Sequence, residues 1–91
     1  MIADIPDELI LQGLEILRSA FGPQRCVAEM YDYNSRGRFR IFDAEDRPLL
    51  RMDKVEKFVL ADRRHLAQTI EAARRRLERN GVALNPWTMP E

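Results

Sequence analysis

Residues 36–42 read RGRFRIF, and their alternation decides how the middle of this chain folds. Successive side chains of a strand point to opposite faces, so Phe39 and Ile41 share one face while Arg38 and Arg40 share the other. The apolar pair is the better candidate for the core. We therefore predict a strand with one buried face and one arginine-bearing face, and the second face is the first candidate for a functional surface.

Strand-forming residues also lie on both sides of this segment. Residues 26–33 are rich in strand formers, residues 34–37 form a polar turn before the alternation begins, and residues 43–48 form another turn. Residues 49–60 read as a third, extended segment. Their alternation changes phase partway, so we expect a bulge or bend near Asp53–Lys54.

One amphipathic helix precedes the strand segments in the sequence, and another follows them. The first ends at Gly22–Pro23, and apolar residues recur on one face of it at Ile10, Leu14, Leu17 and Phe21. Gly13 lies inside this helix, where it costs about 1 kcal/mol relative to alanine, and close helix packing would explain it. The second helix begins after Asp62 and ends at Asn80–Gly81, with its apolar face at Leu66, Ile70, Ala73 and Leu77.

The element order is therefore α-β-β-β-α, which predicts an α+β fold. A three-stranded antiparallel meander has one face to bury, so we expect both helices to pack on that face. Residues 1–81 would form a single domain, and residues 82–91 an irregular tail that docks through Trp87 or hangs free. The first helix is acidic and the second is rich in arginine, so we interpret their charges as complementary flanks of neighbouring helices.

The uncovered face would then interleave aromatic and basic side chains. We predict an interaction surface consisting of Tyr31, Tyr33, Arg38, Arg40, Phe42 and Arg51. Tyrosine, phenylalanine and arginine are enriched in protein interfaces, and acids among them can pair across a two-fold axis. We therefore favour a non-enzymatic protein-interaction module that binds itself as a homodimer or binds another protein. The simpler alternative is a solvated face whose rings are shielded by arginine stems.

Nucleic acid is the second candidate partner. Aromatic rings and arginines on an open sheet are also what a single-strand RNA platform uses. Against this, RGRFRIF lacks the glycine-aromatic pattern of the RNA-recognition motif, and fifteen basic residues balance fifteen acidic ones. The element order also resembles the double-stranded-RNA-binding domain, which implies alternative nucleic-acid contacts at Arg63 and Arg64, although that family's glycine-and-histidine turn and lysine pair are absent.

Catalytic and cofactor motifs are not found. One histidine, His65, and one cysteine, Cys26, exclude a histidine-cluster metal site and an internal disulfide, and there is no phosphate-binding glycine loop. We predict no enzymatic activity and no cofactor. No apolar run is long enough to span a bilayer, and the acidic N-terminus does not fit a signal peptide, so we expect a cytoplasmic protein without membrane contact.

Three stretches carry a family resemblance. They are Ala20–Phe21, the run RFRIFDAEDRPLLR at residues 38–51, and the run ADRRHLAQTIEAARRRLERNG at residues 61–81. In these the chain resembles a family of short uncharacterised proteins of pseudomonads. The resemblance implies a bacterial origin and a small α/β fold. It transfers no functional residue, because the family has no established activity.

Overall fold

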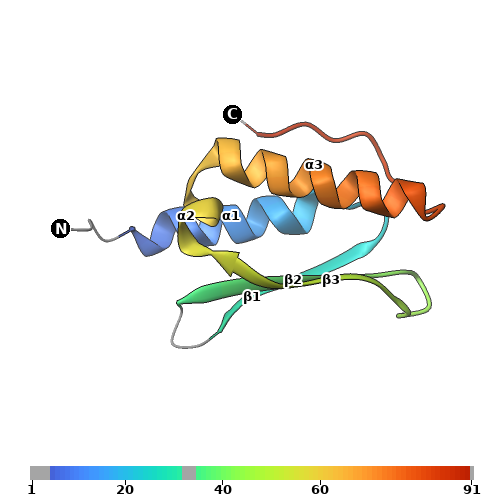
Figure 1. The fold of residues 1–91 in the computed structure, drawn as a ribbon, viewed down its shortest axis with the longest axis horizontal. Helices are drawn as coiled ribbons and strands as arrows, with labels where there is room; N and C mark the ends of the chain where they lie inside the picture. The colour runs from blue at the N-terminus through green and yellow to red at the C-terminus, as the bar shows by residue number, and fades with distance from the viewer. Residues whose placement is uncertain (1–4, 32–34, 91) are drawn as a thin grey trace.

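The structure, a computed structural model, describes residues 5–31 and 35–90, and it confirms the predicted α+β order (Figure 1). Within these residues the elements are α1 (Asp7–Ser19), β1 (Arg25–Tyr31), β2 (Arg36–Phe42), β3 (Pro48–Glu56), α2 (Lys57–Ala61) and α3 (Arg63–Arg79).

The three strands form an antiparallel sheet in the order β1-β2-β3, and α1 and α3 both lie on one side of it (Figure 1). Phe39 and Ile41 point to that side and are 0% exposed, whereas Arg38 and Arg40 on the same strand are only partly buried. The phase predicted from RGRFRIF is therefore confirmed, because the apolar pair can lose its contact with water only under the helices.

The expected bulge in β3 is present at Asp53–Lys54. Gly37 pairs with Val55, but two residues later Phe39 pairs with Met52, so Asp53 and Lys54 together oppose Arg38. A second shift between Ile41 and Phe42 lies at the start of the strand. The extra residue at the first bulge brings Val55 back to the covered face, where it is buried.

The core lies between the sheet and the helices. The Phe21 and Phe39 rings stack with their centroids 5.8 Å apart, which joins the end of α1 to the middle of β2. The remaining large, fully buried side chains are Leu17, Ile41, Leu66, Ile70 and Leu77. All of these side chains except the two on β2 belong to the predicted helix stripes, so the helical periodicity located the core correctly.

The prediction that residues 49–60 are extended is wrong after Glu56, because Lys57–Ala61 forms the short helix α2. Leu60 of this helix is 2% exposed and lies beside two glycines. A Cβ on Gly13 would overlap the Leu60 carbonyl oxygen, and a Cβ on Gly37 would come within 3.0 Å of Leu60 Cδ1. Gly13 thus does permit close packing, but its partner is a helix that the local pattern did not indicate.

Helix α3 begins and ends where its sequence signals predict. Asp62 is its N-cap, and its side chain accepts a hydrogen bond of 3.0 Å from the Arg64 backbone N–H. Beyond the C-terminal end, Gly81 has φ of +83°, a left-handed conformation that glycine adopts without strain.

We expected ion pairs between the two long helices. In the described residues, no ion pair connects α1 with α3. Instead, Arg74 of α3 donates hydrogen bonds to the carbonyl oxygens of Ala20 (2.6 Å) and Asn85 (2.7 Å). The latter belongs to the C-terminal segment, which contains no helix or strand in residues 82–90 and runs back along α3 (Figure 1). Trp87 is partly buried and packs against the core, so this segment docks.

Candidate functional site

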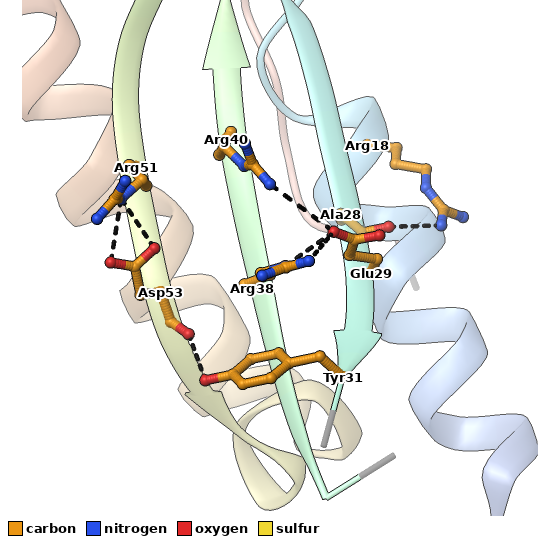
Figure 2. Close-up of polar contacts among 8 residues, drawn as sticks. All are labelled: Arg18, Ala28, Glu29, Tyr31, Arg38, Arg40, Arg51 and Asp53. Atoms are coloured by element: carbon orange, nitrogen blue, oxygen red, sulfur yellow. Dashed lines mark hydrogen bonds and ion pairs between the residues drawn. The ribbon is translucent and has the colours of Figure 1, made fainter. Parts of the chain in front are cut away.

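The candidate site is the side of the sheet that faces away from the helices, which we name the open face. No described element covers it in Figure 1, and in Figure 2 its side chains stand in front of the strands with the helices behind. Cross-strand register assigns to it Arg25, Val27, Glu29, Tyr31, Arg36, Arg38, Arg40, Phe42, Arg51, Asp53 and Glu56.

Two neighbouring rows of this face differ in charge. The register places Val27, Arg40 and Arg51 side by side across the three strands, and we name them the arginine row. The next row on this face lies two residues along the strands, and we name it the acid row. In it Glu29 opposes Arg38, and Arg38 opposes the bulge that contains Asp53. The arginine row carries two positive charges and no acid, whereas the acid row contains both carboxylates beside Arg38, with Lys54 in the same bulge as Asp53.

Tyr31 is held flat across the sheet. Its hydroxyl donates a hydrogen bond of 2.7 Å to the backbone carbonyl of Asp53, which brings the ring from β1 over β2 to β3 (Figure 2). The Arg38 guanidinium lies over the ring, 5.1 Å from its centroid. The bulge at Asp53 therefore does more than restore the phase of β3, because it supplies the acceptor that fixes this tyrosine.

Glu29 is the centre of the ion pairs on the open face. Arg38 binds its Oε1 through Nε at 2.8 Å and through Nη2 at 2.7 Å, whereas Arg40 approaches the same oxygen only to 3.9 Å. The guanidinium of Arg40 makes no hydrogen bond to any described residue. Arg40 also stands directly opposite Arg51 in the register, and like charges in that position repel. It is therefore the least satisfied cation of the two rows.

Phe42 is covered in the same way as Tyr31. The Arg25 guanidinium lies over its ring, 4.7 Å from the centroid, and Arg25 also pairs with Asp46 at 2.8 Å. The strand register brings Arg25 opposite Phe42. Sequence reasoning missed Arg25 because it placed the start of this strand one residue later, and extending the alternation by one position would have included it.

The structure brings five of the six predicted interaction residues together on this face. Tyr31, Arg38, Arg40, Phe42 and Arg51 all belong to it, whereas Tyr33 lies outside the described residues. Arg51 pairs along its own strand with Asp53 at 2.9 Å, and the two side chains are 67% and 61% exposed. Their role as an interaction surface stays a prediction.

Both edges of the sheet carry features that hinder strand addition. On β1, Arg18 of α1 donates a hydrogen bond of 2.7 Å to the Ala28 carbonyl (Figure 2). On β3, the edge begins at Pro48, is interrupted by two register shifts and carries Lys54. Proline, bulges and charged side chains are devices that prevent edge pairing. An additional strand would therefore meet an irregular edge at β3, and at β1 an edge whose Ala28 carbonyl is already bonded.

Arg63 and Arg64 do not join the open face. They form the first turn of α3, in the helical layer on the other side of the sheet (Figure 1). The Arg63 guanidinium donates to the Pro90 carbonyl at 2.6 Å, so it holds the C-terminal segment. A contact with double-stranded RNA would use a surface separate from the aromatic and arginine set.

Cys26 and His65 make separate contacts. Burial raises the pKa of the Cys26 thiol to about 12, against the opposing effect of Arg18, so the thiol is protonated at neutral pH. His65 Nδ1 lies 2.6 Å from Asp62 Oδ2, and its ring meets Phe58 edge-on. In residues 5–31 and 35–90, no group of three or more histidine, cysteine or acidic side chains could hold a metal ion.

Comparison of the chain with known proteins gives no match. No protein-family model, curated protein or solved structure is similar to it. The resemblance to pseudomonad proteins therefore stays a prediction, and the proposed function rests on the geometry of the open face. None of the described helices has both the length and the apolar character needed to cross a membrane.

Proposed function

We propose that this protein is a non-enzymatic interaction module that forms a homodimer through its open face. One observation carries the proposal: the described helices cover the sheet on one side only, while its two edges carry features that hinder strand addition. Association through the sheet is then favoured face to face rather than edge to edge. This preference selects the open face.

The composition of the open face supports a protein partner over a nucleic acid. Single-stranded RNA binds such a sheet by stacking its bases on exposed rings. Here one face of Tyr31 is occupied by the Arg38 guanidinium, and one face of Phe42 by that of Arg25. The carboxylates of Glu29 and Asp53 would also repel phosphates. Rings already paired with arginine still contribute contact area to a protein interface.

A second copy of the chain supplies what the open face lacks. On the outer strands the carboxylates of Glu29 and Asp53 lie one row from the arginine row. A second copy whose acid row lies over that arginine row therefore offers acids to arginines and arginines to acids. Homodimer interfaces of this kind are self-complementary about a two-fold axis. Each copy would thereby gain acceptors for the poorly paired Arg40.

The size of the open face sets the expected strength. Three strands about 4.8 Å apart and seven residues of about 3.3 Å each give a patch of roughly 15 by 23 Å. Stable interfaces usually bury about 800 Å² on each partner, so this patch, with a projected area of roughly 350 Å², belongs with weak and transient interfaces. We expect a dimer whose dissociation constant is roughly micromolar, measurable at protein concentrations of tens of micromolar.

Sedimentation equilibrium over a concentration series tests the proposal. Wild-type protein should change from monomer to dimer with rising concentration. Phe42→Ala removes contact area from the open face and should weaken the dimer about tenfold or more. Phe58→Ala is the matched control, because Phe58 is an exposed ring on α2, in the helical layer, and its loss should leave the dimer unchanged.

A monomer at every concentration, or equal weakening by both substitutions, would overturn the homodimer. Fluorescence titration with short single-stranded RNA at two salt concentrations then provides the other outcome. Binding that falls steeply with salt would show phosphate contacts and support an RNA-binding protein instead, because each neutralised phosphate releases counterions.

A further inference from the structure

We infer that two copies dock with their two-fold axis across the strands, so that Arg51 of each copy meets Asp53 of the other. This inference rests on the proposed homodimer and specifies its geometry. It follows from the charges of the arginine row (Val27, Arg40, Arg51) and the acid row (Glu29, Arg38, Asp53), which are adjacent on the open face.

Two sheets that stack face to face with their strands aligned have two choices of in-plane two-fold axis. An axis along the central strand keeps the position of each residue along the strand direction, so every row stacks on the same row of the second copy. An axis across the strands reverses the positions along the strand direction. If that axis passes between the two rows, the arginine row of one copy stacks on the acid row of the other.

The charges distinguish these two arrangements. With the axis along β2, the arginine row of one copy faces the arginine row of the other. Each row carries two positive charges, and Arg40 lies over Arg40 of the second copy. With the axis across the strands, the arginine row faces the row that contains both carboxylates, Glu29 and Asp53. Like-charge contacts in an interface are strongly unfavourable, whereas complementary rows fix the register. Both arrangements place the central arginines over each other, but only the second also places Arg51 over a carboxylate, so the charges favour the second arrangement.

The across-strand arrangement gives specific partners at the β3 side of each copy. Arg51 stacks over Asp53 of the second copy, and by symmetry Asp53 stacks over the second copy's Arg51. At the centre, Arg40 lies over Arg38 of the second copy, with carboxylates on the two neighbouring strands.

The outer rows add aromatic contacts to the same arrangement. Arg25 comes to Tyr31 of the second copy, and Phe42 comes to the second copy's Arg36. Cation–π contacts can therefore form between the copies at both ends of the interface.

In this arrangement the ion pair between Arg51 and Asp53 of one copy must break, so that each residue can pair with the second copy. Arg51 and Asp53 are paired on the same strand, but both side chains are largely exposed. Exposed ion pairs contribute little to stability, so turning both groups toward a second copy costs little. Figure 2 shows the two side chains together on the open face, clear of the hydrogen bond between Tyr31 and Asp53.

A charge-swap mixing experiment tests this geometry. Arg51→Asp alone places carboxylate against carboxylate at both symmetric contacts, and Asp53→Arg alone places guanidinium against guanidinium. Each variant should therefore dimerise about tenfold or more weakly than wild type. An equimolar mixture restores an acid–arginine pair at both contacts, and we expect a heterodimer with a dissociation constant within about threefold of the wild-type value.

The outcomes separate this inference from the proposed function. Wild type that dimerises while the mixture of variants stays monomeric would overturn the docking geometry alone, and wild type that never dimerises would overturn the homodimer itself. Dimerisation of either single variant with wild-type affinity would also contradict the geometry. If a variant fails to fold by circular dichroism, the milder pair Arg51→Glu and Asp53→Lys provides the same test.

Discussion

The two faces of the same sheet are stabilised in different ways. On the covered face, Phe39 and Ile41 are fully buried and are held by packing against α1 and α3. On the open face, residues that alternate with them on the same strand are held by an ion pair to Glu29 and by cation–π contacts. The difference shows that alternation along one strand supplies both a core and a polar network.

The contrast also separates two kinds of contact. Buried apolar contacts depend on shape, and a vacated space is only partly refilled by its neighbours. Exposed pairs such as Arg51–Asp53 can exchange partners at little cost. The covered face is therefore suited to holding the fold, and the open face to changing partners.

The largest expected effect comes from deleting one ring on each face of β2. Phe39→Ala should lower the free energy of unfolding by about 3–5 kcal/mol, because Phe39 is 0% exposed and stacks on Phe21. Phe42→Ala should lower it by about 1 kcal/mol, because its ring is only partly buried and contacts Arg25. Denaturant unfolding at low protein concentration measures both, and equal losses would contradict the distinction between the faces.

A smaller loss of stability is expected from adding a methyl group at Gly13, where α1 packs closely on α2. Gly13→Ala should lower the free energy of unfolding by about 1–3 kcal/mol although alanine favours helix, because the new Cβ would overlap the backbone of Leu60. Gln12→Ala, at the exposed neighbouring position of α1, is the control and should change it by less than about 0.5 kcal/mol. Stabilisation by Gly13→Ala would mean that α2 does not pack closely on α1.

The smallest effect concerns the polar cap of α3. The hydrogen bond with His65, followed by the one from the Arg64 backbone, lowers the pKa of Asp62 below its usual 3.8. A folded-state pKa below the unfolded one gives stability that is present above about pH 4 and is lost as the pH falls through the folded value. Asp62→Asn can still cap but cannot titrate. Its unfolding midpoint should therefore fall less than that of wild type below about pH 4, and identical acid dependence would contradict the pairing.

The sequence was sufficient for features that depend on local patterns. The alternation in RGRFRIF assigned both faces of β2, Asp62 and Asn80–Gly81 marked the ends of α3, and the phase change in β3 located the bulge at Asp53–Lys54. Each of these signals depends on neighbouring residues and on general preferences of the backbone.

Features that depend on distant contacts could not be predicted. Helix α2 packs by placing Leu60 beside Gly13 and Gly37, residues that are far from it in the sequence. The hydrogen bond from Tyr31 to the Asp53 carbonyl runs from β1 across β2 to β3 and ends at the bulge. The sequence suggested which side chains share the open face, but their pairing follows from the strand register.

Chemical shifts of backbone amides, measured by NMR as the protein is diluted, test the central claim most directly. If the open face is the interface, amides of β1, β2 and β3 should shift with concentration, most strongly near Arg40 and Arg51, while amides of α3 stay constant. Concentration-dependent shifts confined to α3 and the C-terminal segment, or no shifts from micromolar to millimolar protein, would contradict the homodimer through the open face.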